Sequence, residues 1–206
     1  MKATIVLNSN INIDIQGDYI VGVDGGIQQI LKQGKMPNLI IGDFDSYKGI
    51  LPNVETISLN VDKDLTDSEV AVLELIKRGY TEINIYGVEG GRLDHIYSNI
   101  MLIVFAGRQN IKATGILDNG HVTYFQKGSN TINANQGDVV SIFPYAKTHL
   151  KSSNNLKFPL KELSLEIPSK VSGLSNVALE ANPSIEVSEG DGIIFVIKNS
   201  KSQNSK

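Results

Sequence analysis

The chain has 206 residues, of which 41% are apolar, a net charge of −3 and no cysteine. This length and apolar content allow a real hydrophobic core in one large domain or two small ones. The slightly acidic balance argues against the broad basic surface that nucleic acid or an anionic membrane would need, and the missing cysteines exclude disulfides, thiolate nucleophiles and cysteine-ligated metals.

The N-terminal part alternates short β-rich runs with helical patterns. The opening run, residues 3–7, is too short for a signal peptide or a membrane span, so we expect a first strand and a cytoplasmic protein. Strand patterns follow at residues 20–24, 38–46 and 83–91, with helical patterns at 25–34 and 93–107. This alternation predicts a mostly parallel, Rossmann-like sheet with helices on both faces.

The pattern changes from about residue 121 onward. Short strand patterns separated by turn residues continue to the C-terminal region without a long helix. They predict a smaller all-β, sandwich-like domain. We therefore expect an α/β domain over residues 1–125, a β domain over 126–200 and a disordered polar tail over 201–206.

Two acidic residues, Asp43 and Asp45, come at the end of an apolar run in the segment GDFDS. If the strand continues through them, residues two positions apart face the same side. Two adjacent carboxylates repel each other unless a cation joins them, and Mg²⁺ prefers such hard oxygen ligands. A polar turn explains the same residues equally well.

Asp24 ends another apolar run and precedes Gly25 and Gly26 at the start of a helical pattern. Glycines at a helix start allow close backbone approach and leave N–H groups for a phosphate. A helix cap at Asp24 or a tight turn is the alternative. Neither the dinucleotide fingerprint nor the P-loop is present, so a familiar ATPase or protein-kinase assignment is not supported.

A third acidic segment precedes the helical pattern that ends near Gly79. Thr66 and Glu69 have the spacing of a capping box, so local structure alone explains these two residues. It does not explain the additional crowding of charges of both signs at Asp62, Lys63, Asp64 and Asp67. The helix dipole favours Asp67 in the first turn, so a structural role for that residue is the stronger alternative.

The segment YGVEGGRLDH again leads from a strand through glycines to a helix start. Arg92 could hold phosphate oxygens, whereas Asp94 could equally be a helix cap, and a lone histidine such as His95 is more often structural. Four successive strand ends thus carry acidic or phosphate-compatible groups. In a parallel sheet they converge on one edge, which predicts a shared ligand site there.

The motifs VDGG (23–26), PNLIIGDFDS (37–46), LTDSE (65–69) and GGRLDH (90–95) with Asn99 resemble, in order and spacing, those of the thiamine pyrophosphokinase family. The resemblance implies an α/β catalytic domain followed by a β-sandwich. It implies transfer of the terminal pyrophosphate of ATP to the hydroxyl of thiamine, releasing AMP, with Mg²⁺ as cofactor. It also implies a homodimer, with thiamine bound between the catalytic domain of one subunit and the β domain of the other.

The same resemblance assigns roles to individual residues. The metal and phosphates would be served by Asp43, Asp45 and Asp67, and Arg92 and Asp94 would complete the catalytic set. In the C-terminal half, LKFPL and SGLSN look like late family motifs, which implies thiamine contacts from Phe158, Ser175 and Asn176. Nucleotide and phosphate binding would involve Asp24, Gly25, Gly26, Ser46, Lys63, Asp64, Thr66 and His95.

Phe158 stands where a larger aromatic residue is expected, and its alternative is an ordinary core position. Two other functions fit the acidic motifs. One is a magnesium-dependent phosphohydrolase or single-phosphate kinase, which would produce free phosphate or ADP. The other is a non-catalytic nucleotide-binding sensor, although such a protein would be expected to lose one of the acidic positions.

Overall fold

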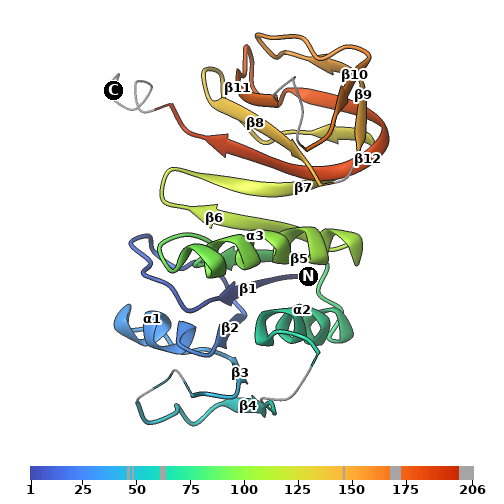
Figure 1. Ribbon diagram of the computed structural model, residues 1–206. Coiled ribbons are helices and arrows are strands. Elements are labelled where there is room, and N and C mark those ends of the chain that lie inside the picture. Colours follow the sequence, from blue (N-terminus) through green and yellow to red (C-terminus); the bar gives the residue numbers. More distant parts are fainter. Residues whose placement is uncertain (46, 48, 61–63, 146, 168–172, 200–206) are drawn as a thin grey trace. The chain divides into compact units, whose positions relative to one another are not determined.

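The computed structural model describes residues 1–45, 47, 49–60, 64–145, 147–167 and 173–199. The chain divides into two compact units, Met1–Asp118 and Asn119–Lys206 (Figure 1). The expected boundary at residue 125 falls inside a strand of the second unit. The expected tail and two expected site residues, Ser46 and Lys63, lie outside the described residues. The predicted mixed α/β class is confirmed.

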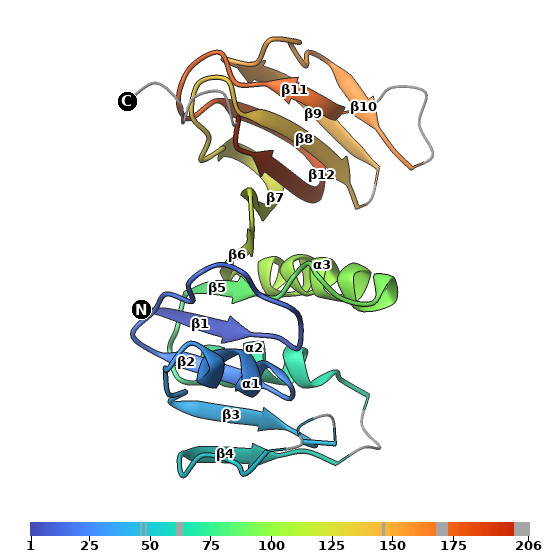
Figure 2. The same ribbon diagram turned by 90° about the vertical axis from the view of Figure 1, so that its left-hand side faces the viewer.

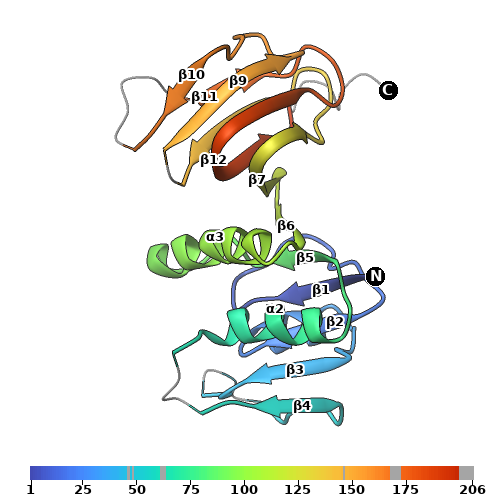
Figure 3. The same ribbon diagram turned by 90° about the vertical axis from the view of Figure 1, so that its right-hand side faces the viewer.

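The first unit contains a parallel sheet in the order β6-β5-β1-β2-β3-β4. Strands β2 and β3 are buried along their whole length, as expected for central strands that are covered on both faces. Figures 2 and 3 show α1 on one face of this sheet and α2 on the other. The elements are β1 (Lys2–Val6), β2 (Ile20–Val23), α1 (Gly26–Lys32), β3 (Leu39–Gly42), β4 (Glu55–Ser58), α2 (Asp67–Lys77), β5 (Glu82–Tyr86), α3 (Leu93–Arg108) and β6 (Lys112–Leu117).

Helix α2 begins as the sequence predicts. Thr66 is its N-cap residue, the Thr66 Oγ1 accepts a hydrogen bond from the Glu69 N–H at 3.2 Å, and the Thr66 N–H donates to Glu69 Oε2 at 2.9 Å. This is the predicted capping box, which satisfies two amide groups that a helix start leaves open. The helix ends before Gly79, which has φ of +82°.

The second unit consists of strands arranged around one long strand, β12, and has no helix among its described residues. β12 pairs with β7 on one side, and on the other with β9 and then β8, all antiparallel. β10 pairs with β9, and β11 with β8. A continuous apolar core that includes Phe125, Val140 and Ile194 fills the interior. The elements are β7 (Gly120–Thr131), β8 (Val139–Pro144), β9 (Thr148–Asn154), β10 (Leu163–Leu165), β11 (Gly173–Val177) and β12 (Ser184–Ile197).

One histidine of the second unit has a perturbed titration. His121 lies on β7, and its Nε2 atom is buried. Burial, together with the positive charge of Lys198, lowers the pKa of His121, and the negative charge of Asp138 opposes that shift.

Among the described residues, no helix has both the length and the apolar character that crossing a membrane requires.

Candidate active site

A cleft of about 520 Å³ opens at the carboxyl edge of the parallel sheet. Parallel strands end at the same edge, so the predicted convergence of strand ends is confirmed for β2, β3 and the segment before α2. The starts of α2 and α3 complete the walls. The lining residues are Leu7, Asn8, Val23, Asp24, Asp43, Asp45, Asp64, Leu65, Thr66, Asp67, Ser68, His95, Ser98 and Asn99.

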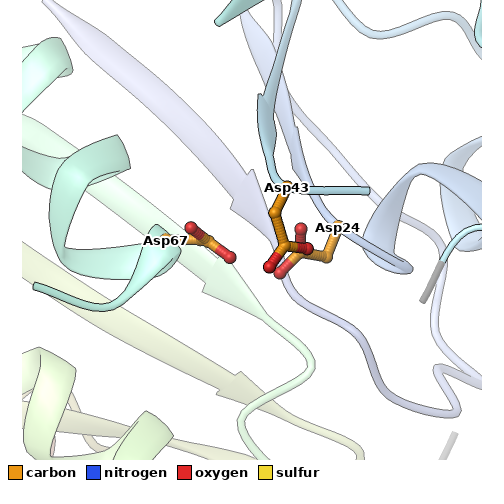
Figure 4. A group of neighbouring side chains, drawn as sticks. All are labelled: Asp24, Asp43 and Asp67. Atoms are coloured by element: carbon orange, nitrogen blue, oxygen red, sulfur yellow. The ribbon is translucent and has the colours of Figure 1, made fainter. Parts of the chain in front are cut away.

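Three carboxylates meet in this cleft. Asp24 follows β2, Asp43 follows β3 and Asp67 is the first residue of α2. One oxygen from each lies within 4.8 Å of the other two, and all three residues are half-buried (Figure 4). Ligands on opposite sides of a Mg²⁺ ion are about 4.2 Å apart. Neighbouring ligands of the same octahedral ion are about 3 Å apart, so these carboxylates would hold Mg²⁺ once their oxygens draw closer together.

The approach of Asp24 to Asp43 depends on Gly42. Asp24 has φ of +46° and Gly42 has φ of +157°. A Cβ atom on Gly42 would lie 1.9 Å from the Asp24 Oδ1, which is buried. Any larger residue at position 42 would thus displace the Asp24 carboxylate from the group.

The expected alternation of Asp43, Phe44 and Asp45 along a strand is wrong. β3 ends at Gly42, Phe44 has φ of +60°, and the Asp45 N–H donates to Asp43 Oδ1 at 3.0 Å. This is the polar turn that the sequence left open as an alternative. Asp45 still lines the cleft, but the three grouped carboxylates include Asp24 in its place.

The two glycines after Asp24 are required by packing within the first unit. Gly25 is the N-cap residue of α1, so Asp24 is not a side-chain cap for that helix. A Cβ atom on Gly25 would lie 2.3 Å from the Asn8 Oδ1, and one on Gly26 would lie 2.0 Å from the Val6 carbonyl oxygen. Both positions therefore need glycine for the close contact between the end of β1 and the start of α1, and neither lines the cleft.

Two residues of the expected catalytic set bind each other instead. The Arg92 guanidinium donates to both carboxylate oxygens of Asp94, at 3.2 and 2.6 Å, and both side chains are exposed outside the cleft lining. This hydrogen bonding is the main cause that lowers the pKa of Asp94. Arg92, not Asp94, is the N-cap residue of α3. His95, the next residue, does line the cleft.

The charge of the cleft determines what it can bind. Its described lining carries five carboxylates, at Asp24, Asp43, Asp45, Asp64 and Asp67, and only one basic side-chain type, at His95. At this density the negative charges repel any polyphosphate. A cation must therefore accompany an anionic substrate that binds here, and carboxylate oxygens favour a hard divalent ion.

The sequence analysis assigned no role to several lining residues: Asn8, Ser68, Ser98 and Asn99. Asn8 lies two residues after the end of β1, so it stands near a strand end like the acidic residues, and that position is the signal that could have revealed it. Asn99 lies one turn after His95 on α3, and its Nδ2 donates to the Gly87 carbonyl at 3.0 Å. It therefore ties α3 to the chain just after β5.

The expected thiamine residues lie in the second unit. The Phe158 side chain is 55% exposed, so the core alternative for this residue is wrong. Ser175 is also exposed, has φ of +59°, and its N–H donates to the Ser141 Oγ at 3.0 Å. Asn176 is buried at 4% exposure, with its amide bonded to main-chain atoms of Phe158.

Comparison with known proteins finds one family throughout. The profile of the family described as thiamin pyrophosphokinase, catalytic domain, matches residues 15–115. The thiamine pyrophosphokinase of Bacillus subtilis (strain 168) is 26% identical over 186 residues, which cover 86% of each chain.

Solved structures share the fold. The thiamin pyrophosphokinase of Geobacillus thermodenitrificans matches with a TM-score of 0.83 at 24% identity, covering 97% of this chain and 99% of that one. The yeast thiamin pyrophosphokinase matches with a TM-score of 0.75 at 17% identity, covering 95% and 86%. The catalytic-domain match falls on the region that contains the three grouped carboxylates, and the chain is similar to thiamine pyrophosphokinases in sequence and in fold.

Proposed function

We propose that this protein transfers the terminal pyrophosphate of ATP to the hydroxyl of thiamine, giving thiamine pyrophosphate and AMP. One observation carries the proposal. The carboxylates of Asp24, Asp43 and Asp67 meet in a cleft within the region that matches the catalytic domain of this family. The net negative charge of the cleft supports the proposal that phosphate transfer here needs a divalent cation.

Mg²⁺ is the proposed cofactor, with Asp24, Asp43 and Asp67 as its protein ligands. When bound, it would neutralise the phosphate oxygens that these carboxylates otherwise repel. Asp45 lies in the same cleft but outside the group of three, so its carboxylate is available to orient the thiamine hydroxyl.

In the proposed reaction the hydroxyl oxygen of thiamine attacks the β-phosphorus of ATP. The new oxygen–phosphorus bond forms as the bond from the β-phosphorus to the bridging oxygen of AMP breaks, and the hydroxyl proton passes to water. In such transfers the protein contributes chiefly by positioning the reactants and neutralising charge. Asp64, Thr66 and His95 line the cleft beside the acidic group, where they would contact the nucleotide. Ser46 and Lys63 are proposed for the same role on the family resemblance alone.

Phosphate binding by Arg92 depends on its ion pair with Asp94. Its guanidinium is held by Asp94, so it reaches phosphate oxygens only if that ion pair opens. Both side chains are exposed, and exposed ion pairs contribute little, so a phosphate can compete for the arginine. Asp94 then acts by holding the Arg92 side chain until phosphate replaces it.

The finer features of the proposal concern the second unit and assembly. The second unit is proposed as a β-sandwich that binds thiamine through Phe158, beside a Rossmann-like catalytic domain, in a cytoplasmic homodimer. Exposed apolar side chains on α3, Leu93 at 82% and Tyr97 at 65%, support an interface on that helix. Mixing Asp43→Asn and Phe158→Ala subunits should restore activity if each site combines two subunits, and leave both variants impaired if it does not.

Product analysis tests the proposed reaction. Purified protein with thiamine, ATP and Mg²⁺ should release AMP and thiamine pyrophosphate in equal amounts. Asp43→Asn should abolish that release. Asp14→Asn, which removes an exposed carboxylate paired with Lys35 elsewhere on the first unit, is the matched control and should stay active. ADP or free phosphate as product would favour the single-phosphate kinase or the phosphohydrolase instead, and nucleotide binding without turnover would favour the sensor.

A further inference from the structure

The side-chain amide of Asn176 has its oxygen fully engaged within the second unit. The Oδ1 atom accepts the Phe158 N–H at 3.0 Å and the Val177 N–H at 2.9 Å, and the Nδ2 atom donates to the Phe158 carbonyl at 2.7 Å. An amide oxygen has two lone pairs, so no acceptor remains for a ligand. Asn176 is also buried at 4% exposure, which places it beneath the surface that a ligand would touch.

These bonds extend a pairing between two chain segments. Leu156 forms a bridge with Ala178, and the Lys157 N–H donates to the Val177 carbonyl at 2.9 Å. On its other side, the backbone of Asn176 pairs with Val140 of β8, next to a bulge in β11. The Asn176 side chain supplies the next pair of hydrogen bonds and so fixes both main-chain polar groups of Phe158.

The backbone of Phe158 is held by hydrogen bonds, whereas its ring is exposed. It is 55% exposed, and the Lys157 ammonium lies 5.5 Å from the ring centroid. An exposed aromatic face on a fixed backbone is suited to stack against a planar heterocycle. Such stacking is strongest when the ring is already ordered before the ligand arrives.

We propose that Asn176 is a positioning residue for thiamine, which holds the Phe158 backbone so that the ring meets the substrate in a fixed place. This inference rests on the proposed function. It replaces the expected direct contact between Asn176 and thiamine with an indirect role. A direct contact through the side-chain oxygen and a positioning role predict opposite effects of a negative charge at position 176.

The test uses a reporter, because the chain contains no tryptophan. Phe158→Trp places a single indole at the proposed stacking position, where its fluorescence anisotropy reports ring mobility and its quenching reports thiamine binding. In this background, Asn176→Ala should lower the anisotropy without substrate. It should raise the thiamine KM about tenfold, the effect of about 1.4 kcal/mol, while kcat and the ATP KM stay within about twofold.

Asn176→Asp separates the two roles. A carboxylate would face the Phe158 carbonyl where the amide now donates, so a positioning residue loses function as fully as in Asn176→Ala. A direct contact to thiamine, which is a cation, through a side-chain oxygen would be kept or strengthened by the same change. Asn130→Ala is the matched control, because its amide also bonds main-chain atoms, those of Gln126 and Gly128 on β7.

Three results decide the proposal. Unchanged thiamine KM in Asn176→Asp, or a raised KM with unchanged indole anisotropy in Asn176→Ala, would overturn it. If Asn176→Ala does not fold, Ser153→Ala loosens the same segment at its other end, where the Ser153 Oγ accepts the Leu160 N–H at 2.8 Å. It should lower the anisotropy in the same direction, and an unchanged anisotropy there would count against the proposal. If the unsubstituted protein releases no AMP, the proposed function fails, but the anisotropy without substrate still tests the hold on the ring.

Discussion

Asp43→Asn should stabilise the protein in the absence of metal while removing its response to Mg²⁺. The three grouped carboxylates form three repulsive pairs, each within 4.8 Å. One such pair costs roughly 0.9 kcal/mol at the dielectric constant of water and roughly 3.5 kcal/mol at the effective value near a protein surface. Neutralising Asp43 removes two of the three pairs.

The substitution is a clean removal of charge. The asparagine Oδ1 can still accept the Asp45 N–H that Asp43 accepts now, so the turn after β3 is kept. We therefore expect a gain of about 2 kcal/mol in unfolding free energy in EDTA, after screening of these half-buried groups. With Mg²⁺ at a hundredfold its dissociation constant, the unsubstituted protein should gain about 2.7 kcal/mol and the variant much less.

Urea unfolding with and without Mg²⁺, at constant ionic strength, measures both quantities. All described helices lie in the first unit, so the helical circular dichroism signal reports the unit that holds the carboxylates. Asp14→Asn should change stability by less than about 0.5 kcal/mol and keep the Mg²⁺ response. A variant that is no more stable than its parent in EDTA, and equally stabilised by Mg²⁺, would refute the account of this site.

Three further predictions concern single residues. Gly42→Ala should abolish the Mg²⁺ response through its collision with the Asp24 carboxylate, whereas Gly34→Ala, with open space around φ of +69°, should cost only about 1 kcal/mol of backbone strain. Thr66→Ala should lower the unfolding free energy by about 1 kcal/mol through loss of the capping box, and Thr66→Ser should restore most of it. Because burial lowers the pKa of His121, its unfolded form binds a proton more readily, so stability should fall as pH drops from about 6.5 through the lowered pKa, and His121→Gln should flatten that slope in urea titrations.

For each of these three predictions, one experimental result would contradict it. An intact Mg²⁺ response in Gly42→Ala would mean that the Asp24 carboxylate has room to move and is not fixed by the glycine. Equal stability of the alanine and serine variants at position 66 would show that the hydroxyl contributes nothing to the helix start. An unchanged slope between about pH 7.5 and 5.5 after substitution of His121 would assign the acid sensitivity to other groups.

The hydrophobic periodicity of the sequence, and the residues that end each pattern, were sufficient to predict which residues lie at the carboxyl edge of the sheet. Alternating strand and helix patterns imply parallel strands, and parallel strands bring their carboxyl ends together, so Asp24, Asp43 and Asp67 were all expected at one edge. The capping box at Thr66 was equally readable, because it depends on residue types three positions apart.

Which of the acidic residues form the group of three carboxylates could not be predicted in the same way. It depends on a left-handed backbone at Phe44, a conformation that non-glycine residues seldom adopt and that the residue type does not predict. The pairing of Arg92 with Asp94 depends on the directions of two exposed side chains, and the burial of Asn176 depends on tertiary packing. For these residues, a motif indicates the neighbourhood, and the three-dimensional structure decides the role.

The pair of hydrogen bonds between Asn176 and residue 158 joins main-chain atoms of that residue only. The scaffold that orients the ring is thus independent of which ring it carries. Exchange of Phe158 for tyrosine or tryptophan would alter stacking area and polarity without rebuilding the loop beneath. Under the proposed role of Phe158, a single substitution there would change the ring that meets the substrate, while the amide below keeps the main chain in place.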